Sequence, residues 1–443
     1  MLQRPLDRRP PSATIRQVNR LVFHFVLLAA WLLPIGTGFA QTAPTRPEAG
    51  ASEEPTSIRV LLLTIGPGDE VFELFGHNAL VVSDPASGFE AAYNWGVFDF
   101  NQPDFVTRFI RGRMLYRLEA LDLGRSIAEY RQGQRDAKLT ELNLSPAQKR
   151  RLLQLCVAND TDANREYTYN YYTDNCSTRV RDMLNAATGN QIAEQLKTQP
   201  ADPPTTLRWH TARIASQAPW FYLVVSIFMG ADLDRPLSKW EESFLPKYLQ
   251  KHLGEVSVTW ADGSVHPILG GSFVVAESGG RVEPAGPPSW GWMFLLAGLA
   301  YGAAVLFASR IGRNATNSLR TGGRWVGWVG LPWAGLCVGL GVVATVGWFF
   351  TDHTGTRNNV NWLQLSPLSL PILVVMVLLV WGRWPSWAVA AAALPVVLSV
   401  VGVAVMLALD QMKSPVLLFA LPAHMGVLAA VVRLKGRSRR TVT

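Results

Sequence analysis

The sequence predicts an α+β exported domain followed by an all-α transmembrane domain of about five helices. Residues 57–288 mix short alternating strands with amphipathic helical segments, residues 289–432 are nearly free of charge, and residues 1–40 resemble an export leader. The whole-chain figures, 49% hydrophobic residues and a formal net charge of +8, therefore average a mixed polar segment and a nearly charge-free apolar one. Most of the positive excess lies at the N-terminus, in one loop and in the tail. Positive charge in those places sets membrane orientation, so it does not indicate nucleic-acid binding.

Residues 1–40 have the order of features found in a signal peptide. Several arginines precede an apolar run from Leu21 to Leu33, and small residues stand before a cleavage point after Ala40. The basic region is long, so an uncleaved anchor is the alternative, and either form exports the segment that follows. Residues 41–56 are rich in Pro, Ala, Thr and Glu and are expected to form a linker.

The first half of the exported domain is expected to alternate strands with short helices. Apolar runs bounded by turn residues predict strands at 58–65, 77–82, 89–98, 114–120 and 137–144. Helices are expected at 100–110, 124–133 and 146–158. The last of these has Ser145 as its N-cap and Pro146 as its first residue, both of which are favoured there.

The second half of the exported domain is expected to be mainly helical. A tyrosine-rich strand leads to Asp174, the predicted N-cap of a helix that holds Cys176 at its second position and runs to about Leu196. The apolar run 219–230 is too short to span a bilayer and fits a buried or interfacial helix. Beyond it we expect two further elements, an amphipathic helix at 237–253 and a small hairpin at 255–285.

Five apolar runs follow, each about as long as the roughly 20 residues that a bilayer requires. They cover 289–308, 325–350, 363–381, 386–408 and 415–432. The loops at 309–324 and 382–385 and the tail at 433–443 carry arginine or lysine, whereas the other two loops are weakly charged. By the positive-inside rule the basic segments are cytoplasmic. This places the 57–288 domain on the outer side, in agreement with the signal peptide.

His77 and Cys176 are the candidate catalytic pair. His77 opens a predicted strand, and Cys176 stands at a predicted helix start. A thiol needs a base, and a helix N-terminus favours its thiolate, so we expect a lowered pKa for Cys176 and backbone N–H groups for an oxyanion. Such a pair performs acyl transfer, in which the thiolate attacks a carbonyl and a second nucleophile removes the acyl group from the thioester.

A third polar group is expected to orient the imidazole. Counting back across the 84–88 turn places Asn94 or Trp95 near His77, so Asn94 is the first candidate and Asn78 the second.

The three cysteines leave an alternative open. In an exported domain Cys156 and Cys176 are able to form a disulfide, which would remove the nucleophile. Cys337 lies in an apolar run and is expected to be a small core residue.

The order of these residues resembles the circularly permuted branch of the papain-like superfamily, where a histidine strand precedes an Asn-Cys helix start. That branch includes the lecithin:retinol-acyltransferase-like proteins and relatives of the peptidoglycan NlpC/P60 enzymes. The closer similarity is to the Lnb type of bacterial lipoprotein N-acyltransferase. It is carried in the exported domain by Gly76-His77-Asn78-Ala79-Leu80, Tyr93-Asn94-Trp95-Gly96-Val97-Phe98, Asp174-Asn175-Cys176-Ser177-Thr178-Arg179, Pro219-Trp220, Ala231-Asp232 and Phe244-Leu245-Pro246. In the membrane part it continues at Thr351-Asp352-His353, Asn359, Asn361-Trp362-Leu363 and Pro367-Leu368.

The resemblance implies a permuted papain-like (NlpC/P60-like) domain with His77 as base and Cys176 as nucleophile. It also implies an activity, the movement of an acyl chain from a phospholipid, through a Cys176 thioester, to the N-terminal amine of a diacylglyceryl lipoprotein. The resemblance does not secure the third residue, so Asn94 rests on the hairpin alone. No cofactor and no metal ion are expected, and the expected location is the bacterial inner membrane with the 57–288 domain in the periplasm.

Six other residues are candidates for substrate contact: Asn78, Asn175, Arg179, His353, Asn359 and Asn361. Arg179 stands close behind Cys176 and is a candidate for a phosphate, although it is equally able to solvate its helix. The last three lie in the 351–362 loop, which is expected on the same side as the pair. Ordinary solvated turn chemistry explains that loop as well.

Other titratable residues receive plainer interpretations. His210, His252 and His266 have no partners at metal-ligand spacing and are expected at the surface. Asp232 and Asp234 are expected in a turn rather than at a metal.

Two other functions remain open. One is a periplasmic cysteine hydrolase, either a peptidoglycan peptidase or amidase or a phospholipase, with water as the acceptor. The other is a non-catalytic envelope binding module, in which Cys156 and Cys176 are joined.

Overall fold

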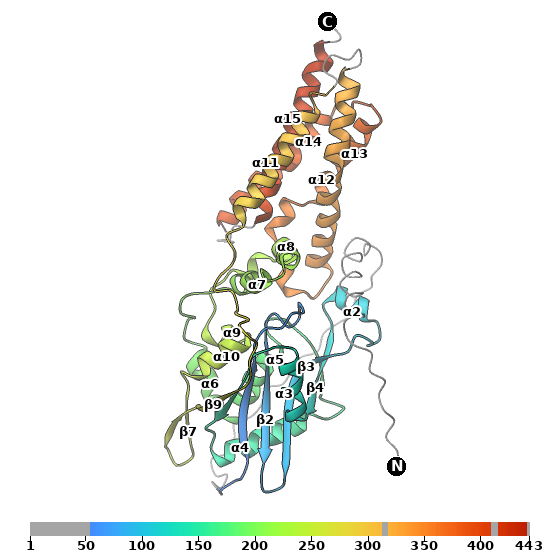
Figure 1. Cartoon of the computed structure of the whole chain (residues 1–443). Coiled ribbons are helices and arrows are strands. Elements are labelled where there is room, and N and C mark those ends of the chain that lie inside the picture. The colour runs from blue at the N-terminus through green and yellow to red at the C-terminus, as the bar shows by residue number, and fades with distance from the viewer. Residues whose placement is uncertain (1–53, 312–317, 409–414, 441–443) are drawn as a thin grey trace, which may run out of the picture.

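A computed structural model of the protein describes residues 54–311, 318–408 and 415–440. The described chain is elongated, with a sheet-containing N-terminal domain (54–288) at one end and a bundle of long helices at the other (Figure 1). The architecture is therefore an α+β domain followed by helices of membrane length, as the sequence predicts. The predicted signal peptide and nearly all of the predicted linker lie outside the described residues.

The N-terminal domain is built on a seven-stranded antiparallel sheet with the order β6-β4-β3-β2-β1-β5-β9. Its strands are β1 (Arg59–Ile65), β2 (His77–Asp84), β3 (Phe89–Phe98), β4 (Leu115–Leu121), β5 (Ala137–Leu142), β6 (Glu166–Thr168) and β9 (Leu269–Ala276). The first five confirm the predicted strands. β2 and β3 form the predicted hairpin, in which Leu80 lies opposite Tyr93.

The strand β9 is absent from the sequence-based prediction. Residues 255–285 do contain the expected hairpin, formed by β7 (Ser257–Thr259) and β8 (Val265–Pro267). They also contain β9, which pairs with β5 at the edge of the large sheet. A local apolar pattern does not identify a partner so distant in sequence, and half of the eight β9 residues are exposed.

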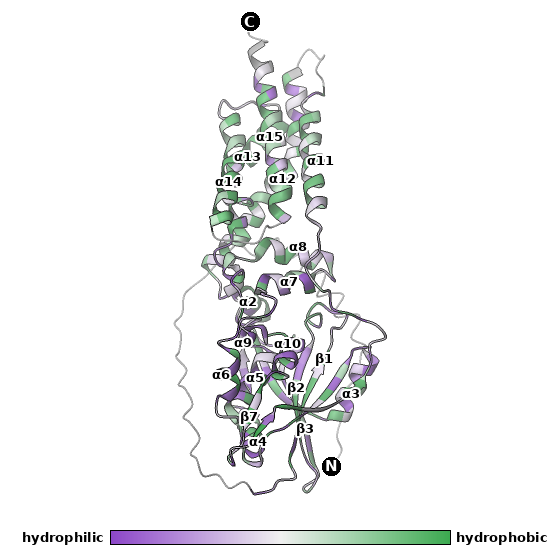
Figure 2. Cartoon of the chain, turned by 90° about the vertical axis from the view of Figure 1, so that its left-hand side faces the viewer, coloured by the Kyte–Doolittle hydropathy of each residue, from purple (hydrophilic) through white to green (hydrophobic). Residues whose placement is uncertain are grey.

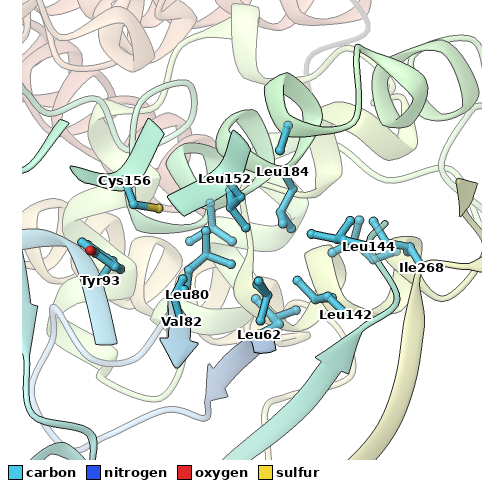
Figure 3. Packing of buried hydrophobic residues seen from close by; sticks show 14 of the residues in the cluster. Leu62, Leu80, Val82, Tyr93, Leu142, Leu144, Leu152, Cys156, Leu184 and Ile268 are labelled. Carbon is cyan, nitrogen blue, oxygen red and sulfur yellow. The ribbon is translucent and has the colours of Figure 1, made fainter. Parts of the chain in front are cut away.

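Alternate residues of the central strands point to opposite faces of the sheet, and both faces are covered. One face packs against α4 (Pro146–Asn159) and α5 (Cys176–Ala187) through a cluster that includes Leu62, Leu80, Val82, Leu152 and Leu184 (Figure 3). The other face packs against α3 (Leu123–Gln132) through a cluster that includes Leu61, Leu63, Ala79, Val81, Leu123 and Ile127. This double burial fixes the register of β2 and therefore the position of its first residue, His77.

The helix predicted from Asp174 to about Leu196 is two helices, α5 and α6 (Gln191–Leu196). Its N-cap is Asn175 rather than Asp174, so Cys176 is the first helical residue and not the second. The break follows Thr188, where Gly189 and Asn190 both have positive φ and leave the helical conformation.

The amphipathic helix predicted at 237–253 is likewise two helices. α9 (Lys239–Glu242) ends before Pro246, and α10 (Pro246–Leu253) begins at it. Proline has no backbone N–H for an internal helical bond but is favoured at a first position. The sequence-based assignment overlooked this stop.

Three helices lie between the sheet and the long helices (Figure 2). They are α2 (Phe105–Arg111), α7 (Leu207–Ala215) and α8 (Pro219–Phe228). α2 is shorter than the predicted 100–110 helix, and α8 falls within the predicted apolar run.

The described residues contain five segments long and apolar enough to cross a membrane, as predicted. Their helices are α11 (Gly291–Ala308), α12 (Ser318–Phe349), α13 (Leu370–Val380), α14 (Ala388–Ala408) and α15 (Pro415–Arg440). The third segment begins at Val360 and reaches α13 through short 3₁₀ turns. α11 and α15 pack closely, since a Cβ at Gly302 would lie 2.7 Å from the carbonyl oxygen of Pro422.

Candidate active site

The cysteine is held by a fully formed helix start. The Asn175 side chain accepts hydrogen bonds from the backbone N–H groups of Ser177 and Thr178, both at 2.9 Å. The hydroxyl of Thr178 accepts in return from the N–H of Asn175 at 2.7 Å. This reciprocal cap fixes the first turn of α5 and with it the Cα–Cβ direction of Cys176. Asn175, a candidate for substrate contact, is thus occupied in capping.

The thiol of Cys176 lies where α5 meets β2 and β3. The backbone N–H groups of Asn78, Ser177 and Cys176 itself act to lower the pKa of this thiol. On β3 a bulge between Trp95 and Val97 includes Gly96, whose φ is +94°. A Cβ at Gly96 would lie 3.4 Å from the Cβ of Cys176, so glycine allows both the bulge and the close approach.

His77 is oriented by Asn94, as the hairpin count predicts. The imidazole Nε2 lies 3.2 Å from Oδ1 of Asn94. The amide nitrogen of Asn94 donates to the carbonyl oxygen of Ala92 at 2.9 Å, which leaves Oδ1 as an acceptor facing the ring. His77 therefore carries its proton on Nε2 and keeps a lone pair on Nδ1 for another proton.

Burial keeps both members of the pair neutral. Burial and the positive charge of Arg135 lower the pKa of His77 to about 4, against the opposing effect of its bond to Asn94. Burial raises the pKa of the Cys176 thiol, which is only 8% exposed, although the three backbone N–H groups and Arg135 oppose the rise. The prediction of a lowered thiol pKa is thus wrong in sign, because desolvation outweighs the helix start.

Asn78 lies behind the pair rather than beside the imidazole. It is fully buried, and its amide nitrogen donates to the hydroxyl of Ser177 at 3.1 Å and to the carbonyl oxygen of Pro246 at 3.4 Å. Its Oδ1 has no hydrogen-bond partner in the described structure. Asn78 therefore ties β2 to the first turn of α5, and Asn94 holds the orienting position.

Four tyrosines lie near the thiol and are called here the tyrosine wall: Tyr116, Tyr167, Tyr169 and Tyr171. The Tyr169 ring lies against Gly96, and Tyr116 stacks on Tyr169 with 4.0 Å between ring centroids. Tyr167 carries a buried hydroxyl without a hydrogen-bond partner in the described structure. Tyr171 packs edge-on against Tyr169 at 5.8 Å and is half exposed.

Arg179 is already engaged by neighbouring residues. Its guanidinium donates to Asp174 at 2.7 Å, and its Cζ lies 4.0 Å from the centre of the Tyr167 ring. Arg179 therefore helps to hold the Tyr167 ring in place near the thiol.

The loop at 351–361, between α12 and α13, meets the N-terminal domain, but only part of it approaches the pair. The His353 ring stacks on Tyr171 at 6.4 Å, and its Nε2 lies 3.0 Å from the carbonyl oxygen of Phe109. Asn359 and Asn361 are buried and donate to carbonyl oxygens at the end of α8. Of these three candidates, the structure brings His353 toward the tyrosine wall and leaves the asparagines as ties between elements.

The sequence analysis did not predict the buried carboxylate of Glu242 near the site. Glu242 accepts hydrogen bonds from His210 at 2.8 Å and from His252 at 2.7 Å. Both histidines are fully buried, which corrects their expected surface positions. The error arose because each lies on a helix and meets Glu242 only through tertiary packing.

Asp232 and Asp234 lie in or next to a short 3₁₀ helix (Ala231–Leu233) and have partners within the protein. Asp232 accepts from Asn358 and Asp234 pairs with Arg208, both at 2.7 Å. Over the described residues no group of three or more His, Cys, Asp or Glu side chains could hold a metal ion.

All three cysteines are free thiols. Cys156 lies on the buried face of α4, in the core (Figure 3), and its burial raises its pKa to about 12. The disulfide alternative therefore finds no support in this structure.

The described residues thus join a thiol, an imidazole and an amide on an α+β domain to five helical segments of membrane length, which defines a membrane protein with a candidate thiol site. Residues 46–213 match the family described as the Lnb N-terminal periplasmic domain. The match assigns this part of the chain, which contains His77, Asn94 and Cys176, to that domain family. Neither the comparison with curated proteins nor that with solved structures gave a match.

Proposed function

We propose that the protein is a membrane-bound cysteine acyltransferase of the bacterial inner membrane. It takes an acyl chain from a phospholipid and passes it to the α-amine of a diacylglyceryl lipoprotein. In this proposal residues 1–40 are a signal peptide or an uncleaved anchor, 57–288 form the periplasmic catalytic domain and 433–443 the cytoplasmic tail. One observation carries the proposal: the Cys176–His77–Asn94 group lies at the end of the domain that contacts the 351–361 loop.

In the first half-reaction Nδ1 of His77 accepts the thiol proton as the sulfur of Cys176 attacks the ester carbonyl carbon. The resulting oxyanion is stabilised by backbone N–H groups at the start of α5. The tetrahedral intermediate collapses, the C–O bond to the lysolipid breaks, and His77 returns the proton to the leaving oxygen. Cys176 then holds the acyl chain as a thioester.

In the second half-reaction the neutral α-amine of the lipoprotein attacks the thioester carbonyl. His77 accepts a proton from the attacking nitrogen, the C–S bond breaks, and the thiol is restored as His77 gives that proton to sulfur. The product is an amide. A pKa of about 4 for His77 supports this role, since a neutral imidazole is present at every pH above that value.

A hydrolase on the same group is the second candidate, with water in place of the amine. The burial of Cys176 beneath a tyrosine wall favours the transferase, since acyl transfer to an amine requires water to be excluded from the thioester.

The test is complementation in cells depleted of their own lipoprotein N-acyltransferase. The native chain and its Cys176→Ser and His77→Ala variants are expressed, and lipoprotein N-termini are read by mass spectrometry. We expect N-acylated termini with the native chain and none with either variant. His266→Ala is the matched control, because His266 lies on the β8 strand of the separate hairpin.

Two outcomes would contradict the proposal. Normal expression of the native chain with only free amines would reject the transferase and favour the hydrolase. N-acylation that persists in Cys176→Ser would leave the activity but reject this site.

A further inference from the structure

The helix α8 presents an apolar face to its surroundings. Trp220 and Leu223 are 47% and 40% exposed, and Val224 is exposed beside them. Their spacing puts them on one side of the helix, while Tyr222 and Ser226 on the other side are buried. α8 contains no charged residue. An exposed face of this kind indicates contact with a partner or a membrane.

The helix α2 combines exposed apolar residues with arginines. Val106 is 44% exposed, Phe109 is similarly exposed, and no residue of α2 is buried. Arg108 and Arg111 lie in the last turn. Long basic side chains beside aromatic ones are typical of segments in the headgroup region, where the charge stays hydrated and the rings reach the acyl chains.

Hydrogen bonds place both helices at the level where the long helices end. The N–H of Asp352 donates to the carbonyl oxygen of Arg111 at 2.8 Å, which ties α2 to the loop after α12. Asn361 donates to the carbonyl oxygen of Ser226 at 2.9 Å, which ties α8 to the segment before α13. A loop between two membrane-length helices lies at the membrane surface, so α2 and α8 lie there too (Figure 2).

We propose that α2 and α8 are interfacial anchors of the N-terminal domain, and that their exposed faces are covered by the phospholipid of the outer leaflet. The phosphates lie against Arg108 and Arg111, and the upper acyl chains lie against Val106, Phe109 and the exposed face of α8. Both helices are hydrogen-bonded to the loop that joins two membrane-length helices, so a bilayer is the partner that covers their exposed faces. This surface holds the tyrosine wall at the height of lipid ester groups.

The anchors are tested by fluorescence quenching on the full chain in nanodiscs of phosphatidylethanolamine and phosphatidylglycerol. Val106→Cys and Leu223→Cys are each labelled with an environment-sensitive dye. Val274→Cys is the matched control, since Val274 is a 60% exposed apolar residue on the edge strand β9. The unsubstituted chain, whose cysteines are buried, gives the background.

We expect nitroxide carried on lipid chains to remove most of the emission at 106 and 223, and aqueous iodide to remove little. The label at 274 should show the reverse. The proposal is overturned if 106 and 223 respond as 274 does, or if both are shielded from either quencher by another part of the chain. Lipid quenching at only one position overturns it for the other helix. These outcomes do not depend on acyl transfer and remain distinguishable from a failure of the proposed function.

Discussion

At the scale of single residues, the central feature is a thiol and an imidazole that are both neutral near pH 7. Burial penalises the charged form of each, and Arg135 further disfavours an imidazolium at His77. Arg135 is itself fixed by Glu73 at 3.0 Å and by the carbonyl oxygen of Gly66. In the proposed reaction the proton therefore leaves Cys176 during attack on the carbonyl and not before it.

The neutral state of the Cys176 thiol predicts how the rate of Cys176 alkylation depends on pH. The rate with iodoacetamide follows the thiolate fraction, so it should keep rising above pH 9, the ordinary thiol pKa. Mass spectrometry of the Cys176 peptide measures the rate at each pH. A plateau between about pH 4 and 8, typical of a thiolate–imidazolium pair, would contradict the assignment.

The positions of His77, Asn94 and Cys176 could be predicted because each depends on local geometry. A two-strand count locates Asn94, and a helix start locates Cys176. The sign of the thiol pKa could not be predicted, because desolvation depends on what the whole fold packs over the sulfur. Arg135 gave no signal for the same reason: it lies between α3 and β5 and approaches the site only in the folded chain.

At the scale of elements, the short segment from Glu242 to Pro246 supports the start of α5. Its backbone carbonyl oxygens accept hydrogen bonds from side chains near the thiol. The carbonyl of Ser243 accepts from Ser177 at 2.8 Å, and that of Phe244 accepts from Asn175 at 3.0 Å. The carbonyl of Pro246 accepts from Asn78. Glu242 anchors this segment between two buried histidines. Burial favours its protonation, but hydrogen bonds from His210, His252 and Thr205 prevail and lower its pKa to about 2.

Replacing Glu242 by alanine should therefore weaken both the fold and the site. Removing one partner of a buried charged group typically costs about 3–5 kcal/mol. We expect a lower midpoint of thermal unfolding in detergent and faster alkylation of Cys176, whose supporting carbonyls are released. Glu241→Ala is the matched control, because Glu241 pairs with the exposed Arg235. Equal midpoints for the two variants would show that Glu242 supports nothing.

The same carboxylate gives a pH dependence of stability. Its folded pKa lies below the ordinary value of 4.5, so its contribution is complete above about pH 4.5 and is lost as the pH falls toward 2. Acid titration of the native chain should show this loss, and Glu242→Ala should lack that component.

Strands and long helices followed from periodicity, but breaks and pairings did not. Gly189 and Pro246 stop helices that the apolar pattern alone would continue. The partner of β5 at the sheet edge is set by the folded chain, so β9 could not be assigned from its own residues.

At the scale of the whole molecule, the 351–361 loop joins the two halves. Asp352 forms an ion pair with Arg113, and His353, Asn359 and Asn361 bond to backbone carbonyls of the N-terminal domain. The domain is thus fixed relative to the helices and stands on the side where this loop emerges.

The proposed orientation is testable by labelling from one side. A membrane-impermeant maleimide should modify Val274→Cys in intact spheroplasts. Gly436→Cys, in the basic end of α15, should react only after permeabilisation. Reaction of Gly436→Cys in intact spheroplasts would reverse the orientation.

The edge position of β9 has a consequence for biogenesis. The ribosome makes β1 to β5 early, but β9 emerges only shortly before α11. The last hydrogen-bonded edge of the sheet therefore closes when α11 is about to leave the translocation channel. A pause in synthesis before residue 269 would leave β5 paired with β1 on one side only, and its open outer edge would invite proteases and aggregation.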